Sequence, residues 1–255
     1  MFLPLGDVNR LRFIRRQWVV LTLIASNVAI TALMWLLANT NADEFVTVSL
    51  GYIPAVVNDL AELEPGLATV PEETTLVTYA FIHAGWVHLI SNMAFLWVFG
   101  DNVEDATGHL RFMLFYLACA AAGALAHGLL VPDSQQPLVG ASGAVAGISA
   151  AYLLLHPKVR VWVLVLGRIP LPLPAWLPLG LWIGMQFVMI VADPFGEISW
   201  AAHVGGILAG VALIPFLKRR DVPLLDRRIV APEAAILEPK PVAAKGTPRR
   251  WGRVR

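Results

Sequence analysis

Apolar runs of about twenty residues recur along this chain, and they restrict its fold more than any other feature. An α-helix needs about that length to cross the roughly 30 Å hydrocarbon layer of a membrane. The composition agrees, because 57% of the residues are apolar and only 15% are charged, whereas soluble domains carry about 25% charged residues. The pattern excludes an ordinary water-soluble fold and predicts a polytopic membrane protein.

The number and length of the runs predict the fold class. Backbone groups that face lipid find no hydrogen-bond partners there, so spanning segments must be helices or a closed barrel. Runs this long, without two-residue alternation, indicate helices. We therefore expect an all-α bundle of six transmembrane helices within residues 18–217. The runs lie at about 18–38, 77–100, 112–131, 140–156, 174–192 and 200–217.

The segments outside these runs predict a short N-terminal segment, a C-terminal tail and one large loop. Residues 1–17 form a short basic N-terminus that is followed by a first run too long for a signal-peptide core, so we expect a retained helix. Residues 218–255 are basic with little periodicity, and we expect a disordered tail that rests on anionic lipid. Residues 39–76 are too long for a plain hairpin, and helical spacing over Tyr52–Leu63 predicts a structured loop in the interface.

The distribution of charge predicts the orientation. All nineteen Lys and Arg residues fall on one side of the expected bundle, whereas the segments on the other side hold ten of the eighteen acidic residues. Because Lys and Arg favour the cytoplasmic face, we expect both termini in the cytoplasm and the acidic face outside, in a bacterial plasma membrane. A net charge of +1 gives no sign of a nucleic-acid partner, and the single cysteine, Cys119, cannot form an intrachain disulfide.

Polar residues within the expected spans are the candidates for chemistry, because such residues are costly in lipid. No Asp, Glu, Lys or Arg lies well within an expected span, which argues against an ion-coupled pump. We expect His127 and Cys119 to be structural and Gln186 to be an interhelical hydrogen-bond partner. The polar candidates are His83, His88, Asn92, His127, Ser142, Gln186 and His203.

Ser142 stands where the fourth helix is expected to begin. From Ser142 to His156 the helix would cover only about 22 Å, which is too short to cross a bilayer. Because Pro157 and Lys158 fix its inner end at the cytoplasmic surface, Ser142 would lie below the outer surface, beneath a polar cavity. A helix N-terminus offers free N–H groups and partial positive charge, which suits a developing oxyanion.

His203 is expected at a similar depth in the sixth helix. Small residues predict close packing of the two helices, with Gly143 on the fourth and Gly206 and Gly210 on the sixth. A serine with a neighbouring histidine is the minimum for nucleophilic acyl transfer. No carboxylate is available in the expected spans to orient the imidazole, so the sequence predicts a dyad rather than a triad.

His88 and Asn92 are four residues apart and share one face of the second helix. Both side chains can donate hydrogen bonds. Together with the backbone N–H of Ser142 they could surround the oxygen of a tetrahedral intermediate. We expect His83 either to support this site or to be an interfacial histidine without a catalytic role.

Three motifs occur in order on the second, fourth and sixth expected spans. They are His83-Ala-Gly-Trp-Val-His88-Leu-Ile-Ser-Asn92, then Gly140-Ala-Ser142-Gly143, then Ala202-His203-Val-Gly-Gly206 followed by Gly210. With these motifs the sequence closely resembles the rhomboid intramembrane serine proteases, over about residues 51–217. One departure is Ala146, where some bacterial members carry a tyrosine that stacks on the histidine, so the positioning of His203 must rest on other groups.

The resemblance implies a rhomboid-like six-helix bundle and an endopeptidase. It implies that Ser142 is the nucleophile, that His203 is the general base, and that His88 and Asn92 are members of the oxyanion hole. We expect Gly140 and His83 to belong to or support that oxyanion hole. The resemblance also implies a cavity open to the outer side, substrate entry near the second and fifth spans, and no metal or other cofactor. The implied substrates are single-span membrane proteins cut within or beside the helix.

Other classes remain as alternatives. A rhomboid-like protein that binds membrane clients without cutting them is the strongest, although an intact Ser142 and His203 argue against it. A transporter would call for a buried charge or matched broken helices. A metalloprotease would need a His-Glu-x-x-His helix, and an intramembrane aspartyl protease would need two buried Asp residues; the expected spans contain neither. The nucleophile turn of soluble hydrolases needs a glycine two residues after the serine, where this chain has Ala144.

Overall fold

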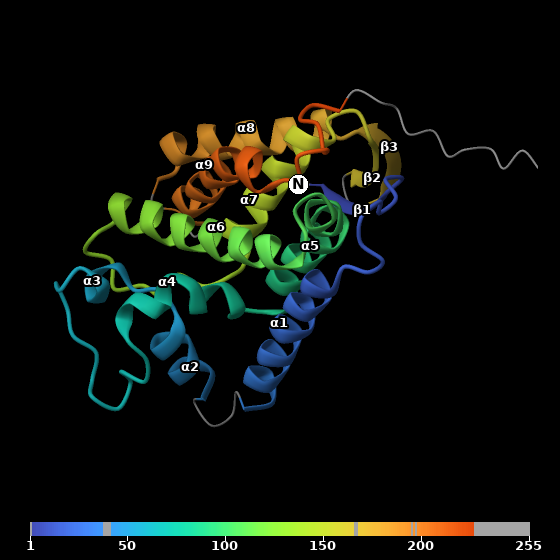
Figure 1. Cartoon of the computed structure of the whole chain (residues 1–255). Coiled ribbons are helices and arrows are strands. Elements are labelled where there is room, and N and C mark those ends of the chain that lie inside the picture. The colour runs from blue at the N-terminus through green and yellow to red at the C-terminus, as the bar shows by residue number, and fades with distance from the viewer. Residues whose placement is uncertain (1, 38–41, 166–167, 195, 197, 227–255) are drawn as a thin grey trace, which may run out of the picture.

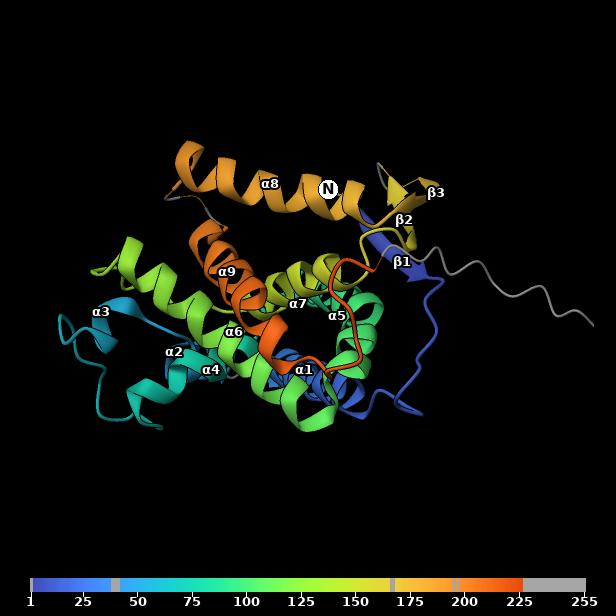
Figure 2. The ribbon, with the colours of Figure 1, turned by 45° about the horizontal axis from the view of Figure 1, so that its top comes forward.

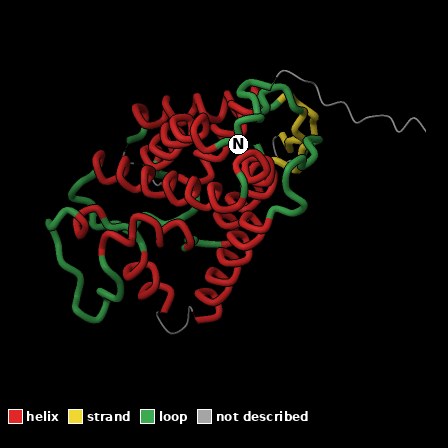
Figure 3. The backbone as a smooth tube through the Cα atoms, viewed as in Figure 1, coloured by secondary structure: helices red, strands yellow, loops and turns green. Residues whose placement is uncertain are grey.

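The computed structural model describes residues 2–37, 42–165, 168–194, 196 and 198–226. Helices make up most of the described chain, and a small sheet lies at one end (Figures 1 and 3). Six apolar helices of 14 to 22 residues follow one another in the order of the six expected runs. They are α1 (Trp18–Leu37), α5 (Trp86–Thr107), α6 (His109–Leu130), α7 (Ser142–Leu155), α8 (Trp176–Ala192) and α9 (Trp200–Leu217).

The lengths of these helices bear on the number of membrane spans. Among the described residues, α1, α6 and α9 are long and apolar enough to cross a membrane. A fourth candidate is α5 taken together with the short helical segment before it, whereas α7 and α8 have only 14 and 17 residues. The chain is therefore a helical membrane protein with three or four candidate spans by length and composition.

The second expected helix is broken. Residues 72–81 form a separate helical segment, made of η2 (Glu72–Thr74), α4 (Thr75–Thr78) and η3 (Tyr79–Phe81), which is bent by 86° from α5. The bend coincides with an extended stretch, since Ile82 has β-region backbone angles and Gly85, directly before α5, is also extended. The prediction of a continuous helix over 77–100 is wrong, and α5 runs on to Thr107 instead.

The extension of α5 beyond the expected span adds the buried carboxylates of Glu104 and Asp105 to the last turn of this helix. Glu104 accepts hydrogen bonds from the backbone nitrogens of Val19 and Val20 at 3.0 and 2.9 Å. Asp105 accepts from those of Phe13 and Ile14 at 2.7 and 2.8 Å. A carboxylate at a helix N-terminus satisfies free N–H groups and complements the helix dipole. Glu104 therefore secures the start of α1 to the end of α5, and Asp105 secures the segment that precedes α1.

A three-stranded antiparallel sheet departs from the all-α expectation. The strands are β1 (Leu3–Asp7), β2 (Arg160–Val165) and β3 (Ile169–Pro174), in the order β1-β2-β3. Figure 2 shows the sheet beside the end of α8 that β3 leads into. Alternate residues of β3 are prolines, which lack an N–H and are tolerated at a sheet edge. The strands are too short and too proline-rich to stand out beside six apolar runs.

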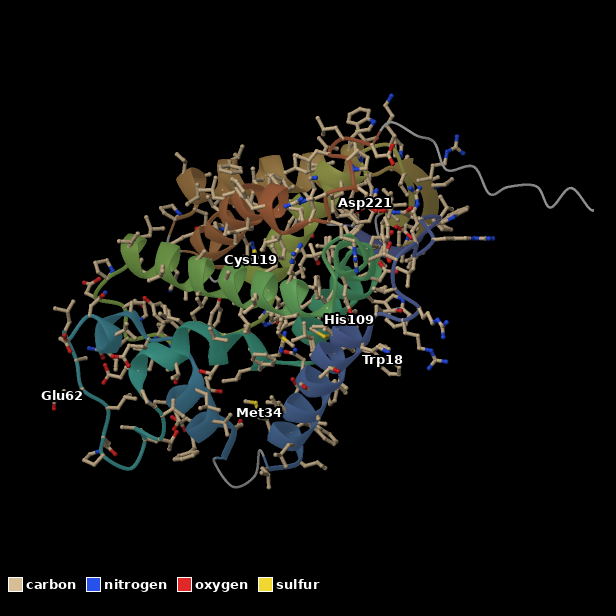
Figure 4. The ribbon with its side chains drawn as sticks, viewed as in Figure 1. Trp18, Met34, Glu62, His109, Cys119 and Asp221 are labelled. Atoms are coloured by element: carbon tan, nitrogen blue, oxygen red, sulfur yellow. The ribbon has the colours of Figure 1, made fainter. Side chains whose placement is uncertain are left out.

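The large loop is structured in a different place from the one predicted. Its longest helix is α2 (Ala42–Leu50), whereas the stretch predicted to be helical, Tyr52–Leu63, contains only the single turn α3 (Pro54–Val57). Pro54 begins that turn, and Asp59, with a positive φ of 57°, follows soon after it. Figure 4 shows Glu62 on this loop, far from Asp221 and the sheet.

The residues after α9 fold back across the ends of two helices. The backbone nitrogen of Arg219 donates to Ala106 O at 2.8 Å, and those of Leu225 and Asp226 donate to the carbonyls of Leu154 and Leu155. These bonds satisfy carbonyls at the C-terminal ends of α5 and α7, which have no partner within their own helices. The expectation of a disordered tail is wrong for residues 218–226, and residues 227–255 lie outside the described residues.

Candidate active site

Ser142 is the first residue of α7, as predicted. The residue before it, Ala141, makes no side-chain cap, so the first turn of α7 keeps free N–H groups. The approach to the helix is held by backbone bonds, since Leu138 pairs with Tyr52 and the Gly140 nitrogen donates to Tyr79 O at 3.0 Å. Ser142 itself is partly exposed, whereas both of its chain neighbours are buried.

His203 lies in the first turn of α9, which begins at Trp200. Ser199 caps this helix, because its Oγ accepts a hydrogen bond from the Ala202 nitrogen at 3.2 Å. The same Oγ lies 2.7 Å from Nδ1 of His127 on α6. This contact supports the prediction that His127 is structural, since it fixes the residue that caps the histidine-bearing helix.

Glycines allow α7 and α9 to approach each other at the backbone. A Cβ atom built on Gly206 would meet the backbone of Gly143, and one built on Gly210 would meet that of Gly147. A Cβ on Gly143 would lie 3.2 Å from the carbonyl oxygen of Ala202. Because Ser142 precedes Gly143 and His203 follows Ala202, this packing brings the neighbourhoods of the two candidate residues together.

The small-residue packing extends to α6. A Cβ on Gly123 would lie 2.8 Å from the Ala202 carbonyl oxygen, and one on Gly147 would lie 2.5 Å from Sγ of Cys119. Figure 4 shows Cys119 near the middle of α6, where it is buried. Three helices thus meet with little side-chain bulk between them, which is the arrangement that small-xxx-small faces permit.

Two histidines lie against the segment that leads into Ser142. The rings of His83 and His88 are 5.0 Å apart at a steep angle. Gly140 has a positive φ of 115°, and a Cβ there would lie 2.6 Å from Nε2 of His88, so this position requires glycine. The Ala141 nitrogen donates to Nε2 of His83 at 3.4 Å. His83 therefore contacts the residue directly before Ser142.

The remaining candidates lie near these histidines. Asn92 is buried one turn after His88, and its Nδ2 has no hydrogen-bond partner among the described residues. His88 lies near enough to His203 for a charge on one ring to affect the other. The structure thus brings α5, α7 and α9 together, with Ser142, His88 and His203 all partly exposed.

Three residues around His203 extend what the sequence predicts. Gln186 on α8 places Oε1 2.8 Å from Nδ1 of His203, which confirms its prediction as an interhelical partner and identifies that partner. Trp182 and Trp200 also lie against His203, with ring centroids 6.1 and 6.0 Å from the imidazole. The i, i+4 spacing of Trp182 and Gln186 places both residues on one face of α8, but the sequence does not indicate that this face packs against α9.

The part of the chain that carries the candidate site is similar to known proteins. The Rhomboid domain family matches residues 71–220. RHOMBOID-like protein 12, mitochondrial, of Arabidopsis thaliana is 32% identical over 162 residues, which cover 57% of this chain and 46% of that protein. Rhomboid protein 1, mitochondrial, of Saccharomyces cerevisiae is 30% identical over 167 residues, which cover 64% of this chain and 47% of that protein.

The plant relatives include a protein of another organelle. Rhomboid-like protein 11, chloroplastic, of Arabidopsis thaliana is 30% identical over 157 residues, covering 60% of this chain and 55% of that protein. The chain thus spans about half the length of the curated relatives it matches. Since the matched domain covers more than half of the chain and includes α5, α7 and α9, the chain belongs to the rhomboid family, which is known for intramembrane serine proteases.

Proposed function

We propose that this protein is an intramembrane serine endopeptidase in which Ser142 and His203 form the catalytic dyad. The observation that carries the proposal is the glycine-mediated contact between the first turn of α7 and the first turn of α9. Ser142 lies at a helix N-terminus, is partly exposed, and stands next to a residue that packs on Ala202, the neighbour of His203.

The proposed reaction is acyl transfer followed by hydrolysis. Ser142 Oγ attacks the scissile carbonyl carbon while Nε2 of His203 takes the hydroxyl proton. The tetrahedral intermediate collapses, its C–N bond breaks, and the imidazolium returns the proton to the leaving amine. A water molecule, deprotonated by His203, then attacks the acyl-enzyme, and Ser142 is released with its proton restored.

We assign the oxyanion hole to donors from two helices. The backbone N–H of Ser142 belongs to the free first turn of α7, and His88 lies against Gly140 two residues earlier. Nδ2 of Asn92, which has no hydrogen-bond partner within the described ranges, is a donor on the same face of α5 as His88. His83 supports the site through its contact with the Ala141 nitrogen.

The proposed membrane arrangement has six spanning helices. In it α7 and α8 complete the bundle although each is short. Because α7 is largely covered by protein, it does not have to reach both surfaces by itself. The Lys and Arg distribution supports both termini on the cytoplasmic side and a site that opens on the opposite side, as in a bacterial plasma membrane. The proposed substrates are single-span membrane proteins cut within or beside their helix.

The test is cleavage of a single-span model substrate by purified protein in lipid, with Ser142→Ala and His203→Ala beside the wild type. We expect both substitutions to abolish cleavage and a chelator to have no effect. A fluorophosphonate probe should label the wild type and not Ser142→Ala. Cleavage by Ser142→Ala would refute the nucleophile, and a wild type that neither cleaves nor is labelled would favour a client-binding protein without protease activity.

A further inference from the structure

Gln186 is the polar residue that contacts His203 most directly, and its second hydrogen bond fixes which way its amide points. Its Nε2 donates to the backbone carbonyl of Trp182 at 2.9 Å, and its Oε1 lies 2.8 Å from Nδ1 of His203. A backbone carbonyl can only accept a hydrogen bond, so the amide nitrogen must face Trp182. The amide oxygen must therefore face His203.

The orientation of the amide determines the tautomer of the imidazole. Because Oε1 of Gln186 can only accept, Nδ1 of His203 must carry the hydrogen. In the neutral ring the other nitrogen, Nε2, then has a free lone pair. This is the tautomer that a general base needs if Nε2 is to take a proton from a hydroxyl group.

The surroundings of Gln186 argue against an incidental contact. It is fully buried, and α8 has only two other buried residues, Pro178 and Leu179. Trp182, one turn earlier, packs against the small cluster formed by Ala146, Ala150 and Ile207. Its ring plane is inclined by 33° to that of His203. One face of α8 thus supplies both a hydrogen bond and a flat surface to the imidazole.

We propose that Gln186 is a positioning residue for the catalytic histidine, holding His203 in the Nδ1–H tautomer with Nε2 directed at Ser142. The inference rests on the proposed function, since it assigns the third member of that site. Gln186 performs with a neutral amide the orienting task that a carboxylate performs in a Ser-His-Asp triad. When Nε2 gains the proton of Ser142, the bond from Nδ1–H to Oε1 becomes charge-assisted and strengthens.

The variants are chosen to separate positioning from packing. Gln186→Met keeps the length and approximate volume of the side chain but removes the acceptor. Gln186→Glu keeps an acceptor and adds a negative charge. Val188→Ala, at an exposed position two residues further on α8, is the control. Among the described residues, the titratable side chain near enough to influence the charge of His203 is His88, which all three variants retain.

Kinetics form the first arm of the test. We expect Gln186→Met to lower kcat about tenfold to a hundredfold with little change in KM, as expected for a lost orienting bond. Gln186→Glu should recover activity, and its negative charge should favour the imidazolium. The acidic limb of its kcat/KM profile should therefore move to higher pH, by about one to three pH units. Val188→Ala should match the wild type.

Nitrogen NMR of ¹⁵N-histidine-labelled protein forms the second arm and requires no catalysis. His203 is one of six histidines, and its signals are assigned by their loss in His203→Ala. The wild type should show His203 with hydrogen on Nδ1 only, and Gln186→Met should show a mixture of tautomers. An unchanged tautomer together with an unchanged kcat in Gln186→Met would overturn the inference.

The two arms also separate this inference from the proposed function. If the wild type neither cleaves nor is labelled at Ser142, the proposed function fails, whatever the tautomer of His203. If the wild type is active but Gln186→Met and Gln186→Glu share its rate and pH profile, only the role of Gln186 fails. Should Gln186→Met not fold, Gln186→Glu and the wild-type spectrum still decide, because both keep an acceptor for the hydrogen on Nδ1 of His203.

Discussion

Replacing Gly206 with alanine should disturb the site without touching any catalytic side chain. A Cβ on Gly206 would lie 2.7 Å from the carbonyl carbon of Gly143, and nearer still to its oxygen. Two carbon atoms normally rest about 3.5 to 4.0 Å apart, so α7 and α9 would have to separate by about 1 Å. Because the obstacle is backbone, no rotation of a side chain can relieve the overlap.

The expected cost of Gly206→Ala is visible in two measurements. Overpacking of this kind destabilises a protein by about 1 to 3 kcal/mol, which should lower the midpoint of thermal unfolding in detergent. A displacement of about 1 Å between nucleophile and base can reduce the rate about a hundredfold. We therefore expect the rate of fluorophosphonate labelling at Ser142 to fall by about that factor even at temperatures where the variant is folded.

Gly184→Ala provides the matched control for this substitution. Gly184 is also a glycine inside an apolar helix, but a Cβ there would meet nothing within 4 Å. Alanine is a better helix former than glycine by about 1 kcal/mol, so this variant should keep its labelling rate and be at least as stable as the wild type. A Gly206→Ala variant that labels and unfolds like the wild type would show that the close approach of α7 and α9 does not set the geometry of the site.

Three further outcomes follow from other contacts. Glu104→Ala should lower the free energy of unfolding by about 1 to 3 kcal/mol in a chemical denaturation series, because the Val19 and Val20 nitrogens lose their acceptor. Burial raises the pKa of Asp7 from 3.8 to about 6, so its contribution to stability is present below about pH 4 and is lost as the pH rises through 6. The melting temperature of the wild type should fall relative to Asp7→Asn over that interval. Asn92→Ala should lower the cleavage rate about 10²- to 10³-fold with nearly unchanged melting, because its Nδ2 has no hydrogen-bond partner in the described part of the chain.

The sequence predicts the parts of the fold that depend on local apolar content. It places five of the six long helices to within a few residues, and it places the start of α7 at Ser142, because lipid-spanning length and helix periodicity are local properties. The second helix is predicted wrongly because residues 77–100 are apolar on both sides of a bend. Hydropathy does not report direction, so an 86° turn before Trp86 leaves no trace in it.

Contacts between distant segments account for most of what the sequence does not predict. The carboxyl of Glu104 satisfies the start of α1, which lies 84 residues earlier, and β1 pairs with a strand more than 150 residues later. Likewise, Gln186 is recognisable as a polar residue in an apolar run, but its partner depends on how α8 packs against α9. The glycines of α7 and α9 are predictable as packing residues because their spacing repeats along each helix.

The attachment of α8 gives the contact between Gln186 and His203 its significance. At its first residues α8 is held by backbone bonds, from Ala175 N to Val159 O and from Trp176 N to Pro157 O. Beyond Leu179, its one buried side chain in the described structure is Gln186. A buried amide in an apolar setting is costly unless its bonds are made, and those of Gln186 are made to Trp182 and His203. Hence any movement that separates the middle of α8 from α9 must break the hydrogen bond that orients His203. The position of α8 and the orientation of the proposed base are therefore linked through that one contact.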